Sequence, residues 1–185
     1  MQGQDRRVTR TRAALIGAFN HLILARRRRG IKVAEIVAAA NVGRSTFYDH
    51  YSSADAILLD AIRHPFGILA DALTGKANTL QLTALLEHFW ENRQIARETL
   101  ARLDARVGRV LADMIEERLA DCTLTIPTRL AALQLAEAAL APIRGWVTAE
   151  APCSPEALAR AIFGCGAAML VALTAAPLEN GHSGC

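Results

Sequence analysis

Apolar residues recur along most of the chain at intervals of three and four positions, the spacing of an amphipathic α-helix. Two-residue alternation with Val, Ile and Thr, which would indicate a half-exposed strand, is missing. Ala and Leu dominate the apolar residues, and both are strong helix formers. The pattern therefore predicts an all-α fold. The 185 residues are enough for one small and one medium-sized domain.

The first third of the chain predicts three helices in close succession. The first covers about 9–28, and Gly30 ends it. Short helices are expected over about 33–40 and 44–51. The turn between them, Asn41-Val42-Gly43, contains two residue types that tolerate the left-handed backbone of a tight turn. Two short helices joined in this way are typical of a helix-turn-helix.

The remaining residues predict a longer helical region. Ser53 is expected to cap a helix over about 54–64, and Pro65 to kink or restart it. Residues 75–78 have loop composition. Further helices are expected over about 79–92, 94–105, 106–121, 127–149 and 155–174. We call residues 1–53 the head and residues 54–178 the body, and we expect a disordered tail over 179–185.

Charge is distributed unevenly between the two ends of the chain. Residues 1–51 contain ten Lys and Arg against three Asp and Glu, a net charge of +7, whereas the rest has a net charge of −4. A basic head on a mildly acidic body suggests that only the head contacts a polyanion. A solvated arginine-rich surface would have the same composition.

Other function classes find little support. The four cysteines form no C-x-x-C pair and have no histidine at zinc-ligand spacing, so we expect no metal or cofactor. Phosphate-loop and nucleophile motifs are also missing, which argues against an enzyme. The polar N-terminus lacks the apolar segment of a signal peptide, which favours a cytoplasmic protein. The uncharged run 161–178 approaches the length of a membrane span, but its Gly and Ala content favours a buried helix and no membrane.

The third predicted helix has two distinct faces. Phe47 and Tyr51, four positions apart, should pack against the two preceding helices. The opposite face carries Arg44, Ser45, Tyr48 and Asp49, with Thr46 and His50 at its flanks. Arginine can form bidentate hydrogen bonds with guanine in the major groove, and hydroxyl and imidazole groups can bind phosphates. These residue types on one face indicate a DNA-recognition helix.

The segment over residues 30–51, GIKVAEIVAAANVGRSTFYDHY, resembles the tetracycline-repressor (TetR) family of transcriptional regulators. The matching positions are Gly30, Val33, Ile36, Ala39, Ala40, Val42 and the run from Ser45 to Tyr51. The strong match covers about residues 9–60. This resemblance implies that Thr46, Tyr48 and His50 bind phosphates, and that Arg44 and Ser45 face bases. Lys32 and the arginines of the first helix should add to the phosphate contacts.

The sequence departs from the family pattern in the head. Asn41 stands where the family often has glycine, which is a mild change. Ala54 stands where the family usually has a lysine that contacts a phosphate. Asp49 places a negative charge near the DNA, where it would accept a hydrogen bond from cytosine or repel phosphate. Ala54 and Asp49 leave open the alternative of a helical ligand-binding or adaptor protein that has lost DNA binding.

For the body, the resemblance implies a ligand pocket between the helices. His88, Trp90 and Met114 are the candidate pocket residues, although such side chains also serve as ordinary core. The last two predicted helices each have a second apolar side, which in a dimer would form a four-helix bundle. Candidate interface residues are Leu133, Leu140, Ile143, Ala161, Gly164 and Ala168. Full burial of both helices within one chain is the alternative.

The resemblance implies a ligand-responsive transcriptional regulator. We expect a homodimer that binds a pseudo-palindromic double-stranded DNA operator, with its two recognition helices in successive major grooves. We further expect repression by occupancy, with release of the operator when a small-molecule inducer enters the body. The sequence does not name the effector or the operator.

Overall fold

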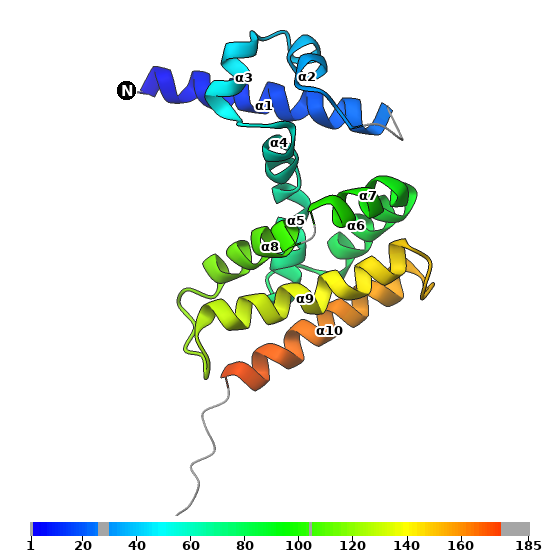
Figure 1. Cartoon of the computed structure of the whole chain (residues 1–185). Coiled ribbons are helices and arrows are strands. Elements are labelled where there is room, and N and C mark those ends of the chain that lie inside the picture. Colours follow the sequence, from blue (N-terminus) through cyan, green and yellow to red (C-terminus); the bar gives the residue numbers. More distant parts are fainter. Residues whose placement is uncertain (1, 26–29, 104, 175–185) are drawn as a thin grey trace, which may run out of the picture.

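The structure, a computed structural model, describes residues 2–25, 30–103 and 105–174, and these residues are helical throughout apart from turns and connecting loops (Figure 1). The all-α prediction is confirmed for this part of the chain. The helices are α1 (Gln2–Ala25), α2 (Val33–Ala40), α3 (Arg44–His50), α4 (Ala54–Ala61), α5 (Arg63–Leu73), α6 (Thr79–Glu91), α7 (Arg93–Leu103), α8 (Ala105–Arg118), α9 (Thr128–Val147) and α10 (Pro155–Thr174).

Most predicted boundaries hold to within three residues, but α1 begins at Gln2 instead of about residue 9, and one predicted helix is divided. The helix expected over 54–64 is separated at Ile62 into α4 and α5. Pro65 lies in the first turn of α5, where the missing amide hydrogen has no helical partner to bind. Pro65 therefore restarts the helix, as expected. The arginines at 26–29 and the predicted disordered tail lie outside the described residues.

Helix ends follow the capping residues of the sequence. The Ser53 hydroxyl accepts a hydrogen bond of 3.1 Å from the Ala56 amide and begins α4. Ser154 does the same for Ala157, with Pro155 as the first residue of α10. Asn41 ends α2 with a φ of 51°, the left-handed conformation that the predicted turn requires.

The head packs α2 and α3 against α1. Leu15 and Phe19 of α1, Ile36 of α2 and Phe47 of α3 are all buried. Their spacing puts one apolar stripe of each helix into a shared core. Figure 1 shows that α4 alone leads from this three-helix unit to the body.

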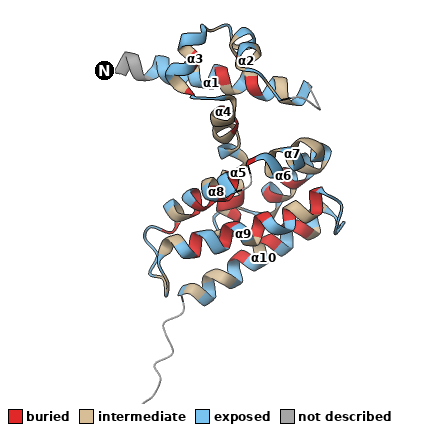
Figure 2. Cartoon of the chain, in the orientation of Figure 1, coloured by how far each residue is buried: buried red, intermediate tan, exposed pale blue. Residues whose placement is uncertain are grey.

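The body is a bundle in which α8 packs on α5 and α9, and α10 packs on α5, α6 and α9. Buried residues gather where these helices face one another (Figure 2). Leu69, Leu73, Leu111 and Ile115 are completely buried at the α5–α8 contact and its surroundings. This core holds α5, and hence the base of α4, in a fixed place in the bundle.

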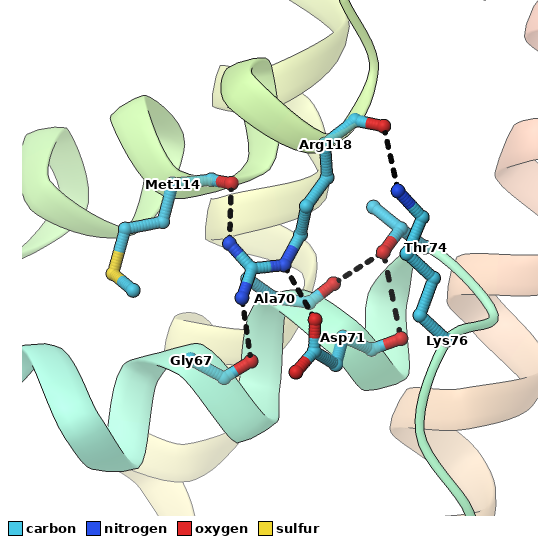
Figure 3. Close-up of polar contacts among 7 residues, drawn as sticks. All are labelled: Gly67, Ala70, Asp71, Thr74, Lys76, Met114 and Arg118. Carbon is cyan, nitrogen blue, oxygen red and sulfur yellow. Dashed lines mark hydrogen bonds and ion pairs between the residues drawn. The ribbon is translucent and has the colours of Figure 1, made fainter.

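A polar cluster closes the α5–α8 contact (Figure 3). The Arg118 guanidinium donates to Asp71 Oδ1 at 2.6 Å, to the Met114 carbonyl at 2.8 Å and to the Gly67 carbonyl at 3.3 Å. Lys76 Nζ donates to the Arg118 carbonyl at 3.1 Å and so satisfies a group at the C-terminus of α8. Charged hydrogen bonds of this kind fix the two helices in register.

Helix α10 is the one described helix that is long and apolar enough to cross a membrane. It packs in the bundle through Leu158, Ala159, Ile162 and Gly166, which are buried. Only 22% of its most apolar window is buried, so the alternative of full burial within one chain does not hold for α10. One side faces the bundle, and the other side is open.

Candidate nucleic-acid interface and ligand cavity

Helix α3 presents a polar face on an apolar support. Phe47 is fully buried, and its ring meets the Tyr48 ring edge-on at 5.5 Å between centroids. On the outer side, Tyr48 is 51% exposed, so its hydroxyl is available to an external partner. Arg44, Ser45 and Asp49 are also exposed, whereas Thr46 and His50 are half-buried. The structure therefore brings these predicted contact residues together on one short helix.

Lys32 stands apart from that group at the beginning of α2. Its backbone amide donates to the Glu35 carboxylate at 3.0 Å, which caps the helix. The residue is exposed. Its cation is thus available at a second edge of the head, where a nucleic-acid backbone could extend past the recognition helix.

A partly buried ionic contact links the head to α4. The Asp60 carboxylate accepts two hydrogen bonds of 2.7 Å from Arg12 of α1. It also accepts a hydrogen bond from the hydroxyl of Tyr51, the residue that ends α3. The Asp60 side chain is only 11% exposed. We call Arg12, Tyr51 and Asp60 the latch, because these three residues tie α1, α3 and α4 at one point.

The latch shifts the ionisation of its members. Burial by itself would raise the pKa of Asp60, but the hydrogen bonds from Arg12 and Tyr51 hold it below its ordinary value. Burial, together with the hydrogen bond to Asp60, raises the pKa of Tyr51 to about 12. The latch therefore holds a charged carboxylate and a neutral phenol over the whole neutral range.

The Tyr48→Phe variant leaves Tyr51 as the single tyrosine of the chain. Its phenol is expected to ionise near pH 12 in the folded protein, instead of near 10.0. Because the folded-state pKa is raised, the stabilisation is complete below pH 10 and is lost as the pH rises towards 12. Tyrosinate absorbance measures this titration, with the urea-unfolded variant as the control. If the phenol of the folded variant ionised near pH 10.0, as in the unfolded chain, the hydrogen bond between Tyr51 and Asp60 would be contradicted.

Helix α4 is tied to the body at its other end. Asp55 pairs with Arg102 of α7 at 3.2 Å and with Arg106 of α8 at 3.0 Å. Asp55, in the first turn of α4, holds the body, and Asp60, near its last residue, holds the head. These contacts make α4 the mechanical connection between the two regions.

A cavity of about 630 Å³ opens where the head, α4 and the body meet. It has the size of a typical site for a small organic ligand. Its lining comes from six stretches of chain: Ile16, Phe19, Asn20, Ile23 and Leu24; Leu58 and Asp60 to Ile62; His64, Pro65, Phe66 and Ile68; Leu85, His88, Phe89 and Asn92; Ile95, Ala96, Thr99, Leu100 and Val107; and Leu140 and Ile143.

Of the three predicted pocket residues, only His88 lines this cavity. Trp90 instead stacks on Trp146 with 4.9 Å between ring centroids, and the Arg93 guanidinium lies 5.1 Å from the Trp90 ring. Met114 is buried, with its methyl group close to Gly67 of α5. Both residues serve as helix-to-helix packing, so the structure does not support their assignment to the pocket. Phe89, which follows His88 on α6, is also in the lining.

The predicted interface residues divide into two groups. Ala161, Gly164 and Ala168 lie on the open side of α10, and Leu133 is 36% exposed on α9. Leu140 and Ile143 are each 1% exposed and line the cavity. Their placement on an outer interface is wrong, because other parts of the same chain already cover both side chains.

The site and fold together define a class of protein: a small helix-turn-helix head carried by a helical body with a cavity at their junction. Comparisons with known proteins point the same way. Over 71 residues, 38% of this chain, the sequence is 38% identical to the HTH-type transcriptional regulator YxbF of Bacillus subtilis. That segment spans only 19% of the length of YxbF. No protein-family model matches the chain.

Among solved structures, the dihydroxyacetone kinase operon activator DhaS aligns over 89% of this chain and 98% of its own, with a TM-score of 0.50 and 18% identity. A TetR transcriptional regulator from Streptococcus agalactiae aligns over the same 89%, with a TM-score of 0.48 and 24% identity. The chain has the fold of the TetR family of transcriptional regulators, as the residues at 30–51 predicted.

Proposed function

We propose that this protein is a ligand-responsive transcriptional regulator that binds double-stranded DNA through α3. The observation that carries the proposal is the polar outer face of α3, held in place by the buried Phe47 within a strongly basic head. A recognition helix needs this combination, because base contacts require a rigid support and affinity requires cations. We place the boundary between the DNA-binding and regulatory domains at residues 53 and 54.

The residues of the head divide into two roles in this proposal. Arg44 and Ser45, exposed in the first turn of α3, face base edges. Phosphates are bound by Lys32, Thr46, Tyr48 and His50, which carry an ammonium group, two hydroxyls and an imidazole. Phosphate contacts fix the register of the protein on the duplex, while base contacts select the sequence.

Arg44→Ala is expected to weaken binding to a selected operator by about 1–3 kcal/mol, roughly 5- to 150-fold, and to relax preference at one base position of each half-site. Selection from a genomic fragment library, followed by titration of the selected operator, measures both effects. Tyr48→Phe is the matched control, since it should weaken all sequences alike. Unchanged affinity and preference in Arg44→Ala would remove its proposed reading role.

We propose a homodimer formed by the open sides of α9 and α10. The small exposed residues Ala161, Gly164 and Ala168 would allow close approach of two copies. Two heads would then reach half-sites about 34–36 Å apart on a pseudo-palindromic operator. The protein would act in the cytoplasm.

Repression is the regulatory sense that we propose, by occupancy of a promoter and release when a small molecule binds. The cavity where the head, α4 and the body meet supports release by a small molecule, because a ligand there would contact both head and body. DhaS, which has a similar fold, is named as an activator, so activation is the other sense to be tested. A reporter placed behind the selected operator decides: expression rises on deletion of the regulator if it represses, and falls if it activates.

A ligand-binding or adaptor protein without DNA binding is the second candidate. The exposed carboxylate of Asp49 on the outer face of α3 is the observation that favours it. Salt dependence separates the two, because a protein that neutralises several phosphates loses affinity steeply as salt rises. Absence of any salt-sensitive binding to genomic fragments would select the adaptor.

A further inference from the structure

The cavity differs from a pocket enclosed by the body alone, because the head forms one of its walls. Ile16, Phe19 and Ile23 from the second half of α1 line it, opposite Phe89 of α6 and Leu100 of α7. A molecule bound there would touch the head directly as well as the body. Its binding energy would therefore depend on how the two are placed relative to each other.

The lining also restricts the chemistry of the ligand. Most of it is aliphatic or aromatic, and the polar groups are Asn20, Asp60, His64, His88, Asn92 and Thr99. The lining contains one carboxylate and no lysine or arginine. An anionic ligand would lie in the same cavity as the Asp60 carboxylate, with Asn, Thr and His side chains but no lysine or arginine to balance its charge, which is unfavourable. A positively charged ligand could instead use the Asp60 carboxylate.

Asp60 belongs to both the cavity and the latch. It lines the cavity, and the same carboxylate accepts hydrogen bonds from Arg12 and from Tyr51 at the end of α3. Asp60 thus belongs both to the lining of the ligand space and to the contact with the residue that ends the recognition helix. The sequence gives no sign of this, because Arg12 and Asp60 lie 48 positions apart.

We propose that the cavity takes a mainly apolar ligand that carries a positive charge or none, and that Asp60 transmits its presence to the recognition helix by releasing the latch. This rests on the proposed DNA-binding function of α3. A cation or hydrogen-bond donor of the ligand competes with Arg12 and Tyr51 for the carboxylate. With the latch released, α1 and α3 lose their polar tie to α4, and α1 keeps only its packing contacts with that helix, while Asp55 still holds α4 to the body.

The consequence is a change in the placement of the head, not a loss of its fold. Phe47, Leu15 and Ile36 keep α1, α2 and α3 packed without the latch. In a dimer, the distance between the two heads could then depart from the value that fits the operator. Ligand and DNA then favour different arrangements, so each weakens the binding of the other by the same factor.

Two probes of nearly equal shape test the ligand class: tetraphenylphosphonium, an apolar cation, and tetraphenylborate, its anionic counterpart. Calorimetry should show at least tenfold tighter binding of the cation. Ala96→Trp fills the cavity from α7 and should abolish cation binding. Ala101→Trp is the matched control, because Ala101 lies exposed on the same helix outside the lining. Equal or tighter binding of the anion, no binding of the cation, or no effect of Ala96→Trp would overturn the proposed ligand class.

The coupling is tested as a ratio of operator affinities with and without saturating tetraphenylphosphonium. We expect the cation to weaken operator binding of the native protein at least fivefold, within the usual range for allosteric coupling. Asp60→Asn should bind the cation more weakly, and at saturating cation its ratio should be close to one. Tyr51→Phe, which removes one hydrogen bond and keeps the ring, should give an intermediate ratio. A native ratio in Asp60→Asn, or in Tyr51→Phe if Asp60→Asn fails to fold, would overturn the role of Asp60.

Failure of this inference is distinguishable from failure of the proposed function. If the cation binds in the cavity but no DNA fragment is bound at any salt concentration, the proposed function fails and the ligand class stands. If the operator is bound and the cation leaves its affinity unchanged, the latch mechanism fails and DNA binding stands.

Discussion

Replacing Gly166 by leucine is expected to destabilise the body by several kcal/mol. A Cβ atom at this position would lie 2.9 Å from both the Cα atom and the carbonyl oxygen of Leu73. These are backbone atoms in the last turn of α5, so they cannot rotate away as a side chain would. Overpacking a core costs about 1–3 kcal/mol when side chains can adjust. Here the two helix backbones must separate, so we expect the upper end of that range or more.

Urea unfolding followed by circular dichroism measures this loss as a lower midpoint concentration. Gly166→Ala is the milder form of the test. Alanine favours a helix by about 1 kcal/mol relative to glycine, so a net loss of stability would show that the contact with Leu73 outweighs helix propensity. Gly164→Ala, two positions earlier in the same helix, is the matched control because its Cβ would meet nothing within 4 Å. Equal midpoints for the two alanine variants would contradict the close approach of α10 to α5.

Most helices could be predicted from the sequence because their signals are local. Ser53 and Ser154 mark where α4 and α10 begin, and Asn41 marks where α2 ends. Each of these is a property of a few neighbouring residues. The head could be predicted best, since the periodicity, the turn and the basic charge all lie within about fifty residues.

The inward and outward sides of α9 could not be predicted. Apolar residues surround much of this helix, so periodicity does not choose one face. Leu133 is partly exposed, whereas Leu140, one heptad later, is buried. Residues seven positions apart lie on nearly the same side of a helix, so the difference arises along the length of α9. Leu140 lies in the lining of the cavity, among residues of other helices, whereas Leu133 lies outside that lining. A choice of this kind depends on neighbours far away in the sequence.

The recognition helix could also be predicted from the sequence, whereas the cavity and the latch could not. Phe47 and Tyr48 could be assigned to opposite faces of α3 from their positions in a single turn of helix. The cavity is built from six separate stretches, and the latch joins residues 48 positions apart. Trp90 resembles a pocket residue by type, yet its partner Trp146 makes it part of the packing between α6 and α9. Residue type alone does not distinguish these roles.

Gly164→Leu is expected to abolish the proposed dimer and to reduce operator affinity by about two to four orders of magnitude. A leucine side chain on the open side of α10 would hold the second copy away from Ala161 and Ala168, which flank it one turn to either side. The monomer should fold normally, because the space around Gly164 is open. Without the dimer, the second head no longer binds as an intramolecular event, and the avidity of about 10²–10⁴ that linkage provides is lost.

Three measurements on the Gly164→Leu variant test the loss of the dimer, the stability of the monomer and the loss of operator affinity. Sedimentation at micromolar concentration should give a monomer where the native protein gives a dimer. Urea unfolding at low protein concentration, where both proteins are monomeric, should give midpoints that agree closely. Binding to a DNA fragment with a single half-site should remain at the native level, because α3 is unaffected, while binding to the full operator falls. A dimeric variant, or a native protein that is itself monomeric at this concentration, would show that the open side of α10 has another role.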